Sequence, residues 1–221
     1  MTAAAPVSLR IDFVSDVVCP WCAIGLKSLE QALQRLQGEV EAEIHFQPFE
    51  LDPNTPADGV DVADNLKRKY GMGDAQLAQN QERIRARGAE LGFTFDFNAR
   101  SRSWNTFDAH RLLHWAEGEG GQRELKHALL RANFSDGRNV SDRDTLVAIA
   151  AGAGLDAQRA RAVLDSGEFA DEVRATEQFF QQLGISGVPA VIIERKHLIS
   201  GGQPPEVFER ALREIAATQR G

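Results

Sequence analysis

Apolar residues follow two different periods in the first part of the chain. Residues 7–14, VSLRIDFV, form a short β-branched and apolar run that predicts a strand. From Trp21 the apolar positions recur at helical spacing as far as Leu36, and Gly38 supplies the stop signal. Residues 40–51 alternate between apolar and polar well enough to predict a second strand. The chain therefore begins β–α–β, with short connections that suit a parallel strand pair.

The middle of the chain has a different pattern. A turn-rich segment, DPNTPADG (52–59), is followed by segments rich in Ala, Leu, Arg, Glu and Gln. Several of them begin with Asp, Asn or Ser and end near Gly, which predicts helices. These segments are residues 61–72, 74–92, 105–120, 122–134, 141–155 and 156–169. Residues 93–100, FTFDFNAR, alternate Phe with polar residues, but no second strand signal follows, and we predict an extended loop there.

Strand signals return at residues 188–195, VPAVIIER, and again at 196–202, KHLISGG. A last helix is predicted over residues 204–218, which begin with two prolines. The order of elements is therefore βαβ…ββα around a long helical insertion. We predict an α/β fold in which residues 1–60 and 176–221 form one domain and residues 61–175 form an all-helical insertion domain.

Composition and charge narrow the classes of function. The 221 residues are 43% apolar and 26% charged, and the formal net charge is −7, which argues against a nucleic-acid-binding surface. The N-terminal segment has no basic region followed by an apolar run, so no secretory signal is predicted. No stretch approaches the ~20 apolar residues of a membrane span. We expect a cytoplasmic protein with neither a nucleic-acid nor a membrane partner.

The two cysteines of the chain, Cys19 and Cys22, lie where the first strand meets the first helix. The first helical turn has unpaired N–H groups and a partial positive charge, which favour a thiolate on Cys19 over the thiol. Pro20 falls near the first helical position, where proline is well tolerated. Cys22, one turn later, is placed to attack a mixed disulfide and release it. The pattern predicts Cys19 as nucleophile and Cys22 as resolving thiol.

Other interpretations of the cysteine pair are weaker. A permanent bridge is unexpected in a reducing compartment, and so short a loop would restrain the unfolded chain little. A structural zinc site needs four ligands, and a lone Cys-x-x-Cys supplies two. His110 and His114, at i and i+4 in an apolar helix, are better explained as core or surface residues than as the missing ligands. We therefore predict no metal site, and inert burial of both thiols is the remaining alternative.

A second candidate element lies far away in the sequence, at GISGVPAVII (184–193). A proline that opens a strand often takes an edge or cis position. A cis Val188–Pro189 bond would leave the Val188 N–H and C=O free to pair with an extended substrate segment. Trp21, between the two thiols, is expected to line the substrate groove, and with Pro20 it tunes the balance between dithiol and disulfide.

Taken together, these segments resemble the DsbA-type branch of the thioredoxin superfamily, and most closely its FrnE-like members. The resemblance spans nearly the whole chain, including the helical insertion, and implies a thioredoxin fold. It rests on DFVSDVVCPWCAIG (12–25), SGVPAVII (186–193), ISGGQPPEVFERAL (199–212) and, less specifically, NTFDAHRLLHWA (105–116).

The resemblance also implies residue roles. In that family the first cysteine attacks, the second resolves, and a cis-proline loop faces them across the substrate groove. Here these are Cys19, Cys22 and the Val188–Pro189 pair. The family often carries a buried acid near the end of its first strand that exchanges protons with the resolving thiol. Asp12 is the best match and Asp16 the second. The spacing between the acid and the cysteines differs from the family's by about one residue.

The resulting hypothesis is a thiol–disulfide oxidoreductase that forms a mixed disulfide with a protein or small-molecule substrate at Cys19. Whether it acts as oxidase, reductase or isomerase is left open. No bound cofactor is expected, and glutathione is a candidate redox partner. One alternative is a glutathione-dependent isomerase or transferase of the kappa or 2-hydroxychromene-2-carboxylate isomerase type. Serine usually replaces the first cysteine there, and an acid that those relatives carry is missing from residues 200–205. A chaperone-like peptide-binding protein is the second alternative.

Overall fold

The structure is a computed structural model that describes residues 5–56 and 58–220. Residues 1–4, where the segment assessed for a secretory signal begins, lie outside the described residues. The elements in chain order are β1 (Val7–Ser15), α1 (Pro20–Arg35), β2 (Val40–Pro48), β3 (Val60–Asp61), α2 (Val62–Tyr70), α3 (Asp74–Glu90), β4 (Arg102–Ser103), α4 (Phe107–Gly118), α5 (Gln122–Phe134), α6 (Arg143–Gly152), α7 (Ala157–Ser166), α8 (Ala170–Gln182), β5 (Ala190–Ile193), β6 (His197–Ser200) and α9 (Pro205–Arg220).

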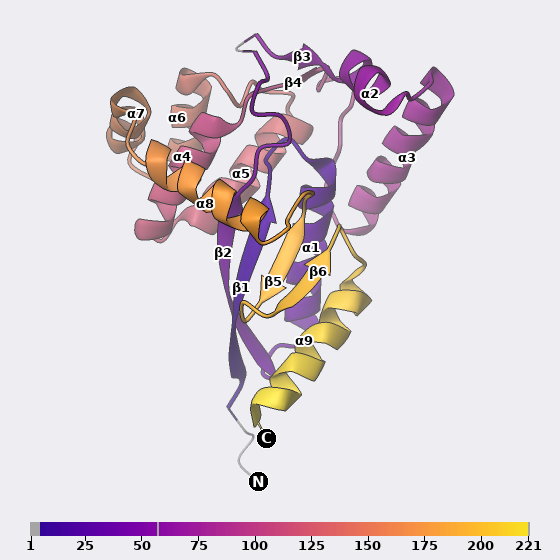
Figure 1. Ribbon diagram of the computed structural model, residues 1–221, viewed down its shortest axis with the longest axis vertical. Coiled ribbons are helices and arrows are strands. Elements are labelled where there is room, and N and C mark those ends of the chain that lie inside the picture. The colour runs from indigo at the N-terminus through magenta and orange to yellow at the C-terminus, as the bar shows by residue number, and fades with distance from the viewer. Residues whose placement is uncertain (1–4, 57, 221) are drawn as a thin grey trace.

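The main sheet has the order β2-β1-β5-β6. β1 and β2 are parallel, as the short β–α–β connection predicts, whereas β5 and β6 are antiparallel to their neighbours. Figure 1 shows α1 behind the sheet and α8 crossing in front of it. The helices α2 to α7 lie toward the end of the molecule opposite the two chain termini. The predicted βαβ…ββα order around a helical insertion is confirmed.

One face of the sheet is covered by α1 and α9. Successive residues of a strand point to opposite faces, so alternate residues of β1 lie on this side. Leu9, Ile11 and Phe13 are fully buried there and pack with Leu29 of α1 and Phe208 of α9 in the largest apolar cluster. The apolar run predicted as a strand therefore has a helix layer on this face.

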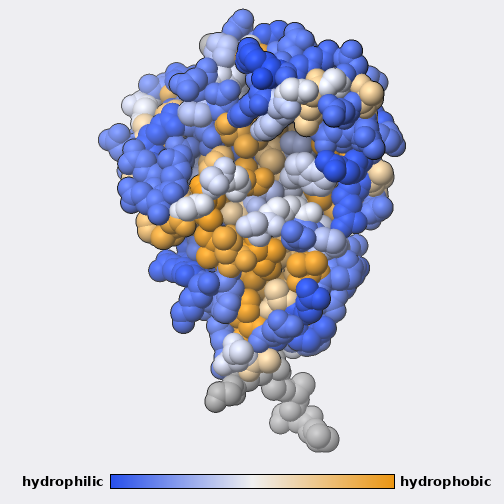
Figure 2. Space-filling view, turned by 45° about the vertical axis from the view of Figure 1, so that its right-hand side comes forward, coloured by the Kyte–Doolittle hydropathy of each residue, from blue (hydrophilic) through white to orange (hydrophobic). Residues whose placement is uncertain are grey.

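The opposite face is covered by α8. Val14, the next residue of β1, packs with Phe180 of α8 and Phe49 in a smaller cluster. The sequence analysis assigned no helix to residues 170–182, whose apolar positions are few. Figure 2 shows an apolar surface running down the middle of this side of the molecule between hydrophilic borders. Within the described residues, the exposed large apolar side chains are Tyr70, Phe179, Leu183 and Leu198.

The helical insertion has its own apolar core, built from α4 to α7. Val17 and Val18, from the turn between β1 and α1, belong to the same cluster, so the insertion packs directly against that turn. Residues 93–100 form no strand, as predicted. Instead, the rings of Phe93 and Phe95 pack edge-to-face against Phe134 of α5. The short ribbon of β3 and β4 was not predicted. The boundaries of the two proposed domains stay a prediction.

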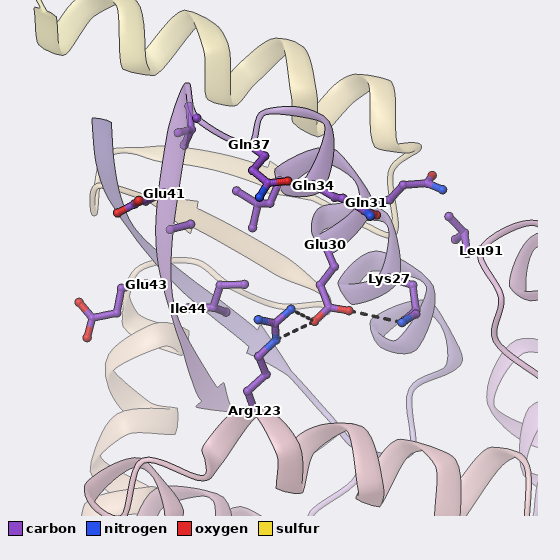
Figure 3. Close-up of a pocket in the computed structure, with 14 residues that line it drawn as sticks. Lys27, Glu30, Gln31, Gln34, Gln37, Glu41, Glu43, Ile44, Leu91 and Arg123 are labelled. Atoms are coloured by element: carbon purple, nitrogen blue, oxygen red, sulfur yellow. Dashed lines mark hydrogen bonds and ion pairs between the residues drawn. The ribbon is translucent and has the colours of Figure 1, made fainter. Parts of the chain in front are cut away.

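The insertion is also fastened to α1 by an ion pair on the surface. Glu30 Oε1 of α1 accepts hydrogen bonds from Arg123 Nη2 (2.6 Å) and lies 2.7 Å from His127 Nε2, both on α5. Figure 3 shows Glu30 pointing between Arg123 and Lys27. Burial alone would raise the pKa of Glu30, but its contacts with His127 and Arg123 outweigh this and lower the pKa to about 2.

This ion pair predicts how stability responds to acid. Because the pKa of Glu30 is depressed in the folded protein, its stabilising contribution is complete above pH 4.5 and is lost as the pH falls toward about 2. Screening by solvent at this partly exposed site leaves an expected contribution of about 1–2 kcal/mol. The measurement is the free energy of urea unfolding of the wild type and Glu30→Gln at a series of pH values.

The difference between the two proteins should be largest near neutral pH and should shrink as Glu30 becomes protonated. Glu41→Gln, which removes an exposed carboxylate from β2, is the matched control. A difference between wild type and Glu30→Gln that does not change with pH would contradict the ion-pair explanation.

Candidate functional site

Cys19 occupies the N-cap of α1, as the sequence predicts. Its backbone is extended, with φ −89° and ψ 114°, and Pro20 takes the first helical position. The Cys22 N–H donates to Cys19 O at 3.1 Å, which closes the first turn and puts the two thiols on one side of it. Both cysteines are free thiols; Cys19 is 4% exposed and Cys22 is 0% exposed. Cys19 is therefore the more accessible of the two thiols.

The environment shifts the two thiol pKa values in opposite directions. A hydrogen bond from the Cys22 side chain, helped by the N–H groups of Cys22 and Trp21, lowers the pKa of Cys19 despite the opposing effect of burial. Burial raises the pKa of Cys22 well above its usual range, and the neighbouring Cys19 raises it further. When the pair loses one proton, the negative charge therefore forms on Cys19 rather than on Cys22.

The loop before β5 faces the two thiols. The Val188–Pro189 peptide bond is cis, and the Cys19 thiol donates to Val188 O at 3.6 Å. Pro189 packs so closely on α1 that a Cβ built on Gly25 would lie 3.0 Å from its Cγ. The Cys-x-x-Cys turn and the cis-proline loop, predicted far apart in the sequence, therefore meet. Gly25 allows the close approach because it has no Cβ atom.

Of the two candidate acids, Asp16 lies at the thiols and Asp12 has other partners. Asp12 accepts hydrogen bonds from Arg10 Nη2 and Gln47 Nε2, each at 2.8 Å, on the face of β1 away from α1. Asp16, 1% exposed, is the carboxylate whose charge acts on Cys19. Asp16 rather than Asp12 thus lies beside the thiols, because Asp16 follows the last residue of the strand and is buried in the turn.

Asp16 is held by groups from its own turn and from two other segments. Its Oδ2 accepts a hydrogen bond from the Leu51 N–H at 2.8 Å, and its Oδ1 accepts one from the Val18 N–H at 3.4 Å. His110 Nε2 of α4 lies 3.5 Å from Oδ1. Burial would raise the pKa of Asp16, but His110 and the N–H groups lower it overall. A buried carboxylate is therefore kept in its charged form beside the thiols.

A groove with a volume of about 590 Å³ opens above Cys19. One wall is Trp21 with the Val188 loop, and the opposite wall comes from α2 and α3 of the insertion. The Arg83 guanidinium of α3 lies 5.2 Å from the centre of the Trp21 ring and closes one side. The predicted position of Trp21 in the groove agrees with this arrangement.

Two cations of the insertion also act on the thiols, and neither of them was predicted from the sequence. Arg100 Nη2 donates to Val18 O at 3.0 Å, and its guanidinium lies 4.8 Å from the centre of the Phe134 ring. Burial lowers the pKa of Arg100 to about 10, while Cys19 and Asp16 act to raise it. Lys126 is 0% exposed and interacts electrostatically with both cysteines. No local motif marks either cation, since each reaches the site through the packing of its own helix or loop.

Two further searches concern metals and membranes. In the part of the chain that the structure describes, no group of three or more His, Cys, Asp or Glu side chains is arranged to hold a metal ion. Among these same residues, no helix has both the length and the apolar character required to cross a bilayer.

Comparisons with known proteins agree with the fold. A probable DsbA oxidoreductase from Streptomyces coelicolor is 40% identical, with 96% of this chain and 92% of that one covered and a TM-score of 0.89. An uncharacterised protein of Bacillus subtilis, YwbO, is 28% identical over 93% of this chain and 96% of its own length. The cytosolic disulfide reductase DsbM from Pseudomonas aeruginosa, solved with GSH, is 19% identical over 96% of this chain and 98% of that one, with a TM-score of 0.61, and so shares the fold.

The family description that matches this chain, "DSBA-like thioredoxin domain", covers residues 10–213. It therefore includes both cysteines, the whole helical insertion and the cis-proline loop. The thioredoxin fold and the enzyme class that the sequence resemblance implied, a DsbA-like disulfide oxidoreductase, are those of this family. The chain belongs to the DSBA-like thioredoxin domain family.

Proposed function

We propose that this protein exchanges thiols and disulfides through a mixed disulfide at Cys19. The observation that carries the proposal is the opposite shift of two adjacent thiols at the start of α1. The pKa of Cys19 is lowered, chiefly by the Cys22 side chain, and burial raises the pKa of Cys22. A thiolate is the attacking species in disulfide exchange. Cys19, the more accessible of the two thiols, is therefore the one prepared to react.

In the first step, the Cys19 thiolate attacks one sulfur of a substrate disulfide. A bond forms between Cys19 and that sulfur, the substrate disulfide breaks, and the second substrate sulfur leaves as a thiolate that takes up a proton. In the second step, Cys22 loses its proton and attacks Cys19. The Cys19–Cys22 disulfide forms, the remaining substrate sulfur leaves, and the substrate is reduced while the protein is oxidised.

The reverse sequence oxidises a substrate dithiol by the same contacts, and the reduction potential of the pair sets the direction. We propose that Val188 and Pro189 receive the substrate segment beside Cys19, with Trp21 forming part of the same wall of the groove. Glutathione is proposed as a redox partner. The structure of DsbM, which shares this fold, was solved with GSH and supports glutathione as a candidate. Asp16, rather than Asp12, is proposed as the acid that exchanges protons with the thiols.

The contacts of Cys19 predict how fast it reacts with iodoacetamide. Because the Cys22 side chain is the largest influence lowering the pKa of Cys19, we expect Cys19 to be alkylated well below pH 8.5 and before Cys22. Cys22→Ala should move the midpoint of the rate–pH profile upward. Cys22→Ser keeps a hydrogen-bond donor and should move it less. Mass spectrometry of alkylated peptides gives both rates, and modification of Cys22 first would contradict the assignment.

The proposed roles also predict which variant traps an intermediate. Cys22→Ser should accumulate a covalent adduct between Cys19 and a disulfide-containing peptide, because the resolving thiol is missing. Cys19→Ser should form no adduct and should lose turnover. Intact-protein mass spectrometry under non-reducing conditions measures both, and Cys19→Ser/Cys22→Ser is the matched blank.

The same experiment separates the proposal from its alternatives. Full activity of Cys19→Ser toward peptides would support a peptide-binding role without redox chemistry. A Cys19–Cys22 pair that shows no reversible disulfide in glutathione buffers would overturn thiol–disulfide exchange. Where the pair is reversible, the same titration gives its reduction potential and so the direction in which it runs.

A further inference from the structure

Lys126 is a fully buried lysine next to the redox pair. Its side chain is 0% exposed, and among the described residues none accepts a hydrogen bond from Nζ. The ammonium lies 5.9 Å from the centre of the Phe46 ring. Burying a charge without hydrogen bonds is strongly unfavourable unless other charges balance it. This lysine therefore needs an explanation beyond packing.

The position of Lys126 is fixed by its own helix. The Gln122 side chain, one turn earlier on α5, accepts a hydrogen bond from Phe46 N (2.9 Å) and donates to Phe46 O (3.1 Å) on β2. At the other end of the same face, Asn133 Nδ2 donates to Val17 O at 3.4 Å. Residues four and seven positions further along a helix share a face. Lys126 thus lies on the helix face between two anchor points, one on β2 and the other on the turn that carries Cys19.

The charges around Lys126 are mainly those of the redox site. Cys22, Asp16 and Cys19 are the groups whose negative charge acts on Nζ, in that order. Two further groups lie near Asp16. His110 Nε2 is 3.5 Å from Asp16 Oδ1, and Arg100 interacts electrostatically with Asp16 and Cys19. Lys126 is the cation that acts directly on Cys22, whereas Arg100 borders the groove above Cys19.

We propose that Lys126 is a positioning residue for the second step: its ammonium stabilises the Cys22 thiolate that displaces substrate sulfur from Cys19. The inference deepens the function proposed above and rests on it. The Cys22 proton leaves as the thiolate forms, the thiolate bonds to Cys19, and the departing substrate thiolate takes up a proton. Lys126 keeps its charge throughout and exchanges no atom.

The electrostatics agree with this geometry. Burial and the adjacent Cys19 raise the pKa of Cys22, and the positive charge of Lys126 is the side-chain charge that opposes them. Burial lowers the pKa of Lys126, and Cys22 acts in the opposite direction. Each group therefore favours the charged form of the other, which is the relation expected of a thiolate and an ammonium in a medium of low dielectric constant.

The test follows the two steps separately in Lys126→Met. Reduced protein is mixed rapidly with dipyridyl disulfide, which releases one absorbing thiopyridone when Cys19 attacks it and a second when Cys22 resolves the adduct. We expect the first release to be nearly unchanged and the second to be about tenfold slower near pH 7. The pH profile of the second release should move upward by about one unit, since one unit of pKa changes the thiolate fraction about tenfold.

Two controls keep the outcome clear. Lys196→Met removes an exposed lysine from the turn between β5 and β6 and should leave both releases unchanged. Methionine fills the space of the lysine chain without its buried charge, so Lys126→Met should unfold at the same urea concentration as the wild type or a higher one. Lys126→Gln, polar and uncharged, should slow the second release in the same way.

The results that would overturn the inference differ from those that would overturn the proposed function. A second release with wild-type rate and pH profile in Lys126→Met shows that the ammonium has no part in resolution. Clear destabilisation of both Lys126 variants with the wild-type pH profile assigns the residue to the structure alone. Failure of wild-type protein to release the second thiopyridone contradicts the proposed disulfide exchange itself.

Discussion

The turn from β1 into α1 is the constraint on which the site depends. Its backbone polar groups are buried, and buried N–H and C=O groups require partners. Asp16 accepts from the Val18 N–H, Arg100 donates to Val18 O, and Asn133 donates to Val17 O. The partners of this turn therefore come from the turn itself and from two separate segments of the helical insertion. Cys19 is positioned by these contacts because it directly follows the groups they hold.

The same contacts determine the charge balance of the site. Asp16 and a thiolate on Cys19 bring negative charge into a region from which water is largely excluded, and such charges persist only when opposite charges are near. Arg100 lies on the groove side and Lys126 on the core side, with His110 beside Asp16. In the proposed exchange, a thiolate on Cys19 or on Cys22 therefore has a positive charge acting on it.

The sequence predicted what local rules determine. The strand–Cys–helix junction, the proline at N1 and the parallel β1–β2 pair each follow from neighbours in the chain. Lys126 and Arg100 escaped prediction because their burial depends on how α5 and residues 93–100 pack, which no local period records. The sequence could not show which of Asp12 and Asp16 lies beside the thiols for a related reason: a strand alternates faces, but the turn after it does not. Helix α8 was not predicted, and its buried face combines Val173 and Phe180 with the charged Glu177 between them.

Helix α5 shows why the insertion and the thioredoxin part act as one unit at the thiols. Gln122 pairs with both backbone groups of Phe46, so it satisfies β2 where the strand would otherwise present an open edge. On the outside, Arg123 and the neighbouring His127 bind Glu30 of α1. A helix held at the edge strand and at α1 has little freedom to rotate, so the direction of Lys126 is set by both parts of the fold. The chemistry of the pair therefore cannot be assigned to the βαβ…ββα framework alone: the framework presents the thiols, and the insertion supplies buried positive charges that act on them.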